Sequence, residues 1–153
     1  MRGVSFRIPR EYNKYLWKIF ECVDYSKYTW YISQDEILYF DEREGKANSN
    51  FFQKKVLTGK EFQECITKTD YYIYLVNIQA YPTNGEKIDI VTYDDFKKSK
   101  CEILFLCADS EYIDLYSKND EYTKKVFDLC IRNEWKDVKY ITDMNDERIG
   151  LSL

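Results

Sequence analysis

The segment from Cys101 to Cys107 limits the possible folds most, because it carries apolar side chains on both faces. A short strand of that kind is typical of the interior of a sheet. Asp109 and Ser110 follow it and favour a tight turn, since short polar side chains tolerate turn conformations. The next segment, Tyr112–Tyr116, alternates in polarity and predicts a returning strand. The sequence therefore predicts an inner strand joined to its neighbour by a hairpin.

Hydrophobic spacing predicts the other elements. Alternation predicts further strands at Gly3–Ile8, Tyr28–Ile32, Ile37–Phe40, Tyr71–Ala80, Ile88–Val91 and Val138–Ile141. Helical spacing predicts helices over Arg10–Cys22, from the Thr58 cap to Ile66 and from Asn119 or Asp120 to Cys130, with a single helical turn at Tyr93–Lys98. Two short connections, Ser33–Asp35 and Asn84-Gly85, are expected to be hairpin turns.

This order of elements predicts the α+β class. We expect a mixed or antiparallel sheet with about three helices packed mainly on one face. No internal repeat or composition shift divides the chain, so a single domain over residues 1–153 is expected.

The absence of histidine narrows the possible functions. Histidine is the usual proton shuttle near neutral pH and the commonest metal ligand, and none occurs in the 153 residues. This argues against Ser-His-Asp hydrolases, Cys-His proteases and most zinc and non-haem iron sites. The net charge is −4, so the protein lacks the positive electrostatic field that nucleic-acid binding normally requires. We therefore expect no nucleic-acid partner.

Signals for export or membrane insertion are not recognised. Residues Met1 to Pro9 hold no apolar stretch typical of a signal peptide, and the longest hydrophobic run, Ile103–Ala108, is far too short for a membrane span. The five cysteines form no Cys-x-x-Cys pair, and an odd number cannot all pair within one chain. We therefore expect reduced thiols, a cytoplasmic location and no membrane partner.

No motif identifies a cofactor, a metal site or a catalytic residue. The chain has no glycine-rich phosphate loop, no G-x-G-x-x-G and no G-x-S-x-G. Asp143–Glu147 resembles the start of a calcium loop, but Arg148 stands where the turn needs glycine. An Asx turn after the last strand, with Asp143 or Asn145 bonding its own backbone, explains the same residues. Asp94-Asp95 is explained by the start of a helix, where acidic side chains are favourable.

Tyrosines are the strongest candidates for a binding surface. If the strands alternate, not all of the tyrosines on them can point into a core. A helix that covers the outer face would bury them, whereas an uncovered face with tyrosines among charges is typical of protein–protein contacts. Both alternatives stay open. The candidate partner-binding residues on strands are Tyr72, Tyr74, Tyr112 and Tyr116.

A second candidate docking point lies in a polar segment. Asp41–Lys55 is rich in Asp, Glu, Gly, Asn and Ser, which predicts a long surface loop. Phe51 and Phe52 lie near its end and are candidate contacts for a partner.

Three segments resemble an uncharacterised family of short proteins from Gram-positive bacilli and their mobile elements. They are Met1–Pro9, reading MRGVSFRIP, Tyr28–Ile32, reading YTWYI, and Tyr140–Arg148, reading YITDMNDER. The resemblance extends over nearly the full length. The family is known as a domain of unknown function, so it implies a bacterial cytoplasmic origin but no activity, cofactor or catalytic residue.

These observations lead to three hypotheses. The first is a non-enzymatic binding protein, such as an inhibitor, immunity partner or regulator, that recognises another protein through an aromatic-rich surface. The second is a small-molecule or nucleotide-binding module in which aromatic rings enclose a flat ligand. The third is a carboxylate- or tyrosine-based enzyme, which would need two acids close together with perturbed pKa values.

Overall fold

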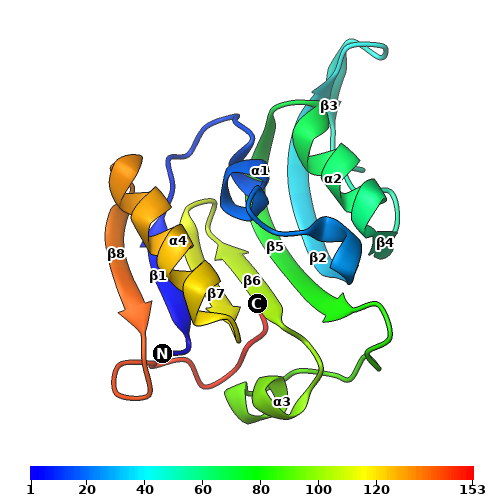
Figure 1. Ribbon diagram of the computed structural model, residues 1–153. Helices are drawn as coiled ribbons and strands as arrows, with labels where there is room; N and C mark the ends of the chain where they lie inside the picture. The colour runs from blue at the N-terminus through cyan, green and yellow to red at the C-terminus, as the bar shows by residue number, and fades with distance from the viewer.

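The computed structural model describes residues 1–153 and consists of one eight-stranded sheet with four α-helices (Figure 1). The strands are β1 Gly3–Arg7, β2 Tyr28–Asp41, β3 Lys46–Asn48, β4 Val56–Thr58, β5 Tyr71–Pro82, β6 Ile103–Ala108, β7 Tyr112–Ser117 and β8 Lys136–Ile141. The helices are α1 Tyr15–Phe20, α2 Gly59–Lys68, α3 Tyr93–Lys98 and α4 Asp120–Arg132, with a short 3₁₀ turn at Tyr25–Lys27. The expected α+β class is confirmed. The number of helices is larger than expected.

The sheet is antiparallel throughout, with the strand order β3-β2-β5-β6-β7-β1-β8 and with β4 paired to β2. The predicted inner strand is confirmed, because β6 lies between β5 and β7 and its first five residues are all buried. Asp109 and Ser110 have φ angles of 50° and 67°, the left-handed conformation of a tight hairpin turn. The prediction of that hairpin is therefore correct.

Three helices cover one face of the sheet. In Figure 1, α1, α2 and α4 lie in front of the strands, and α3 lies at the lower end of the molecule. The larger core, of 30 buried residues, fills the space between the three helices and the sheet. At its centre the rings of Trp30 and Phe62 stack with centroids 3.9 Å apart, and Phe20 packs edge-on against both. Much of the aromatic content therefore serves packing.

The cap that the sequence predicts for α2 is present. The Thr58 side chain accepts from the Glu61 backbone N–H, and the Glu61 carboxylate accepts from the Thr58 N–H. This reciprocal pair satisfies two donors that the first turn of a helix leaves free. Asn119 caps α4 by accepting from the Tyr122 N–H, so of the two predicted caps the structure uses Asn119.

The predicted hairpin at Ser33–Asp35 is wrong. β2 runs as one strand through these residues, and its pairing with β5 shifts register between Ile32 and Gln34 and again between Glu36 and Ile37. Ile32 and Ile37 are both buried although they are an odd number of residues apart. Strict alternation cannot place them on one face, whereas bulges can, because each inserts one unpaired residue.

The predicted hairpin at Asn84-Gly85 is also wrong. Gly85 donates to the Pro82 carbonyl at 2.7 Å in a turn, but the residues that follow form no strand. Neither Asn84 nor Gly85 has a positive φ angle, which the expected turn type requires. β5 is already paired on both sides, with β2 and β6, so a returning strand has no free edge. Instead the segment crosses the second face of the sheet, where Ile90 is buried.

The first helix is shorter than its predicted span of Arg10–Cys22. Asn13 forms an isolated bridge with Tyr71, and their backbones exchange hydrogen bonds of 3.0 and 3.3 Å. This bridge holds the chain extended until α1 begins at Tyr15.

None of the four α-helices is long and apolar enough to cross a lipid bilayer.

The segment Asp41–Lys55, predicted as a long surface loop, contains a short strand and two buried phenylalanines. β3 pairs with the end of β2 inside it. Phe51 and Phe52 are only 7% and 1% exposed, and their rings contact Tyr71 and Phe62 respectively. The expectation that these two phenylalanines form an exposed docking point is therefore wrong, because the core holds them.

Candidate functional site

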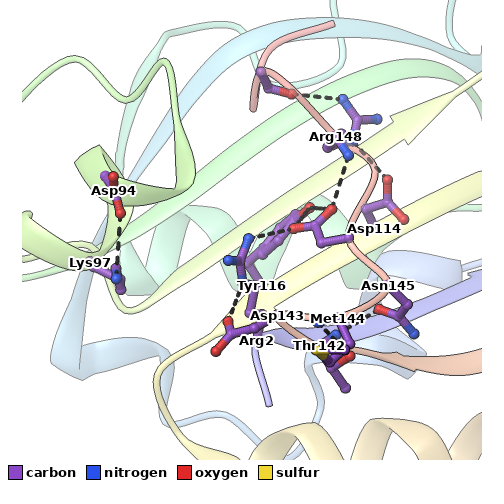
Figure 2. A network of polar contacts seen from close by, with 12 residues as sticks. Arg2, Asp94, Lys97, Asp114, Tyr116, Thr142, Asp143, Met144, Asn145 and Arg148 are labelled. Atoms are coloured by element: carbon purple, nitrogen blue, oxygen red, sulfur yellow. Dashed lines mark hydrogen bonds and ion pairs between the residues drawn. The ribbon is translucent and has the colours of Figure 1, made fainter.

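The second face of the sheet is covered over only part of its length. α3, the segment before it and residues 142–153 pack there over a small core. Figure 2 shows the polar contacts that hold the C-terminal segment: Arg2 donates to the carboxylates of Asp143 and Asp146 at 2.7 and 3.0 Å. The Tyr116 hydroxyl donates to Asp146 at 3.1 Å. The hydrogen bond from Arg2 lowers the pKa of Asp143 below its usual value. These contacts fix the segment against β1 and β7.

The same segment contains the residues that resemble a calcium loop. Asn145 accepts from the Thr142 backbone N–H at 2.8 Å and donates to the Tyr140 carbonyl at 2.9 Å. Arg148 binds the carboxylate of Asp114 on β7 at 2.8 Å. The alternative of a turn that ends the last strand and is held by Asn145 is therefore correct, whereas the Asx geometry itself occurs at Asp146, which accepts from the Arg148 N–H at 3.1 Å. No group of three potential ligand side chains in the structure could hold a metal ion.

The other part of the second face is open and bears tyrosines. We call it the tyrosine patch and define it as Tyr12, Leu38, Tyr72, Tyr74 and Tyr112. Tyr12, Tyr74 and Tyr112 are 47%, 43% and 49% exposed. The ring centroids of Tyr12 and Tyr72 lie 5.6 Å apart, and those of Tyr72 and Tyr74 lie 4.7 Å apart. The side chains of Tyr12, Tyr72 and Tyr74 therefore form a continuous aromatic surface.

The backbone explains why these rings gather. Leu38 pairs directly with Tyr72 across β2 and β5, and the bridge of Asn13 to Tyr71 brings Tyr12 beside Tyr72. The second register shift leaves Tyr74 as an extra residue in β5. Cross-strand neighbours on one face lie within contact distance of each other. Strands and a bulge, not a flexible loop, hold the patch in place.

The extra residue in β5 lets core residues on both sides of it face the helices. Ile73 and Val76, which belong to the larger core, leave two residues between them. Tyr74 and Leu75 both lie outside the core as a result, and Tyr74 is exposed. Tyr74 thus lies outside the core as Tyr72 does, as alternation from Ile73 requires, and the bulge returns Val76 to the core face.

The structure separates the predicted partner-binding residues into two groups. Tyr72, Tyr74 and Tyr112 gather on the open part of the second face. Tyr116 is fully buried beneath α3 and the C-terminal segment, so its expected exposure is wrong. Tyr12 belongs to the patch but was not predicted, because it falls within the helix predicted over Arg10–Cys22. Nothing in its local spacing indicates the bridge that places it beside Tyr72.

Negative charges at the rim of the patch are unpaired. Glu36, on β2 across from Leu75, is exposed and forms no ion pair. Asp109 is exposed at the tip of the hairpin between β6 and β7, and it also forms no ion pair. The tip touches the patch, because the Ser110 N–H donates to the Tyr74 carbonyl at 3.1 Å. The free charge on these two sides of the patch is therefore acidic.

Positive charges at the β1 side are neutralised within the chain. Glu111 is 7% exposed and binds the guanidinium groups of both Arg7 and Arg10. Arg7 also binds Asp137 at 3.0 Å, and its guanidinium lies 5.1 Å from the Tyr112 ring centroid. The hydrogen bond from Arg7 lowers the pKa of Glu111 below its usual value.

Glu111→Gln should reduce the loss of stability in acid. A carboxyl whose pKa is lowered in the folded state stabilises the fold above its unfolded pKa, and this contribution is lost as the pH falls through the folded pKa. The wild type should therefore lose more stability between pH 7 and pH 3 than the variant. Urea unfolding midpoints of both proteins at the two pH values measure this. Equal losses would show that the Glu111 cluster does not contribute to the acid sensitivity.

Three surface hollows lie away from the patch. The largest of the three, about 860 Å³, lies between β2, the segment Phe51–Lys54 and α2. The others, about 570 and 220 Å³, lie between α1 and α4 and beside Tyr28. Side chains of both charges line all three. In the largest, the rings of Tyr39 and Phe51 contact each other with centroids 5.8 Å apart, so they do not flank a gap for a flat ligand.

The shifted carboxyl groups all share one direction. The pKa values of Asp24, Glu61, Asp95, Glu111 and Asp143 are each lowered, in every case mainly by hydrogen bonds to the carboxylate. A general acid at neutral pH would need the opposite shift. The hypothesis of a carboxylate-based enzyme therefore gains no support from these groups.

Fold and surface together define an α+β protein whose antiparallel sheet is covered by helices on one face and bears exposed tyrosines on the other. The family described as "Protein of unknown function (DUF2691)" matches residues 1–152, and the chain belongs to this family. It is similar to the "Uncharacterized protein YncE" of Bacillus subtilis (strain 168), with 33% identity over 152 residues that cover 99% of each chain. No solved structure matches. The resemblance inferred from the three sequence segments is thus confirmed.

Proposed function

We propose that the protein is a non-catalytic cytoplasmic binding protein that docks another protein on the tyrosine patch. The observation that carries this proposal is the contact series of Tyr12, Tyr72 and Tyr74 on an uncovered sheet face. Tyrosine is enriched among the residues that contribute most to protein–protein affinity. Its ring supplies apolar area, and its hydroxyl supplies a hydrogen bond.

The rigidity of the patch supports the same proposal. Ordering side chains on binding reduces affinity, so rings that are already held in place bind more tightly. Leu38 and Tyr72 lie on two directly paired strands of the sheet. The backbone of Tyr74 is fixed in addition by the hydrogen bond from Ser110, and its ring lies against that of Tyr72. A partner can therefore bury these rings with little loss of conformational freedom.

The cysteines support the proposed location. All five are free thiols, and Cys22 is exposed. Exposed free thiols are typical of reducing compartments, where disulfides do not accumulate. Secretion to an oxidising compartment would leave at least one of them without an internal partner.

The double variant Tyr72→Ser/Tyr74→Ser should remain folded and should lose its partner. The two rings are partly exposed, and neither belongs to a core cluster, so their removal should leave unfolding nearly unchanged. Loss of two central aromatic contacts should weaken binding by at least about tenfold. The measurement is affinity capture from cells that make the protein, identification of the captured protein, and titration of the purified pair.

Trp17→Ser is the matched control, because Trp17 is 40% exposed on α1 and lies outside the patch. It should bind the identified protein as the wild type does. A partner that binds the double variant as tightly as the wild type would refute the proposed function.

A further inference from the structure

The chain places basic side chains over some of its accessible tyrosine rings, but over only one ring of the tyrosine patch. Outside the patch, Arg2 lies 3.8 Å from the Tyr93 ring centroid and Lys87 lies 5.5 Å from that of Tyr31, whereas the half-buried rings of Tyr28, Tyr39 and Tyr140 carry no cation. Within the patch, Arg7 covers only Tyr112. No lysine or arginine of the chain lies over Tyr12, Tyr72 or Tyr74.

We propose that the segment of the partner protein that occupies the patch is basic and inserts arginine side chains over these three rings. This inference rests on the proposed function and specifies the chemistry of its partner. A guanidinium group stacks on an aromatic face and is weakly hydrated, so it can leave water at low cost. The contact of Arg7 with Tyr112 is the same interaction made within the chain.

Charge complementarity supports a basic occupant over an uncharged one. Glu36 and Asp109 lie at two sides of the patch without a counter-ion. Carboxylates accept paired hydrogen bonds from a guanidinium group. Arg7 and Arg10, the nearest basic groups at the β1 side, are already bound to Glu111. A stacked arginine would therefore find free acceptors and no free positive charge on these sides.

The arrangement also favours arginine over lysine. The rings of Tyr72 and Tyr74 have centroids 4.7 Å apart and planes inclined at 45°, so a planar group can lie flat on one of them at a time. A guanidinium group stacks flat on an aromatic ring and is weakly hydrated, whereas an ammonium group is a compact, strongly hydrated charge. We therefore expect an arginine peptide to bind more tightly than a lysine peptide of the same length.

The test uses short synthetic peptides of alternating glycine with arginine, lysine, glutamine or proline, titrated into the isotopically labelled full chain and followed by NMR. The arginine peptide should shift the ring resonances of Tyr12, Tyr72 and Tyr74 and leave those of Trp17 unchanged. The glutamine and proline peptides should not shift them. Added salt should weaken the binding of the arginine peptide, because salt screens the attraction between exposed charges.

Two variants, one of them with a matched control, sharpen the result. Tyr74→Ser should lower the affinity for the arginine peptide about threefold to fivefold, as expected for one exposed ring–cation contact. Glu36→Gln should weaken it also, whereas Glu64→Gln, which removes an exposed and unpaired carboxylate on α2, should not. Peptide binding that neither Tyr74→Ser nor Glu36→Gln weakens would overturn the inference.

Other outcomes separate this inference from the proposed function. Binding of the proline or glutamine peptide as tightly as the arginine peptide would refute a basic occupant. If no peptide shifts the rings, yet the captured partner depends on Tyr72 and Tyr74, the inference fails and the proposed function stands. If the captured partner is indifferent to those tyrosines, the proposed function fails whatever the peptides do.

Discussion

Replacement of Trp30 by alanine should lower the free energy of unfolding by about 3–5 kcal/mol. Trp30 is fully buried, stacks on Phe62 at 3.9 Å and meets Phe20 edge-on. Its indole N–H also donates to the Tyr25 carbonyl at 3.3 Å. The variant therefore leaves a large cavity between the sheet and α2 and removes the partner of a buried carbonyl. Urea denaturation followed by circular dichroism measures the loss.

Trp17→Ala is the control of the same residue type. Trp17 is 40% exposed on α1, so its replacement should change the free energy of unfolding by less than about 1 kcal/mol. Similar losses in both variants would contradict the placement of the aromatic core around Trp30.

Gly3→Ala should lower the free energy of unfolding by about 3 kcal/mol, although it adds only one methyl group. A Cβ at Gly3 would lie 1.9 Å from the Leu115 carbonyl oxygen and 2.9 Å from the Tyr116 Cα. Both are backbone atoms of β7, the strand that pairs with β1. They cannot move aside as a flexible side chain could, so the two strands must separate. The same urea experiment measures this loss.

Gly150→Ala provides the comparison. A Cβ at Gly150 would meet its nearest neighbours at 3.5 and 3.9 Å, which are ordinary contact distances. We expect a change of less than about 0.5 kcal/mol. If Gly3→Ala proved as mild as Gly150→Ala, the close pairing of β1 with β7 would be wrong.

The fold class and the central hairpin could be predicted because their signals are local. The apolar run from Cys101 to Cys107 requires burial on both faces, and Asp109 and Ser110 have side chains that tolerate a left-handed turn. The cap at Thr58 depends on two residues one turn apart in sequence. In each case the residues that decide the structure lie within a few positions of each other.

The errors arise where distant segments decide the structure. Ile32 and Ile37 imply two strands only if bulges are ignored, and β5 supplies the pairing that stabilises those bulges. Asn84-Gly85 is a strong local turn signal, but both edges of β5 are occupied by strands elsewhere in the sequence.

The candidate site was predicted in part for the same reason. Alternation showed that some tyrosines must lie outside the core, and Tyr72, Tyr74 and Tyr112 do. It could not show that α3 and the C-terminal segment bury Tyr116, or that the core receives Phe51 and Phe52. The presence of Tyr12 in the patch depends on the bridge between Asn13 and Tyr71, two residues far apart in the chain.

The central claim, that a partner protein covers the tyrosine patch, is tested most directly by hydroxyl-radical footprinting of the purified complex. Mass spectrometry then compares the oxidation of each side chain in the free and bound protein. We expect strong protection of Tyr12, Tyr72 and Tyr74, with Trp17 oxidised equally in both states. Protection of Trp17 and the groove between α1 and α4, with the three tyrosines oxidised as before, would contradict it.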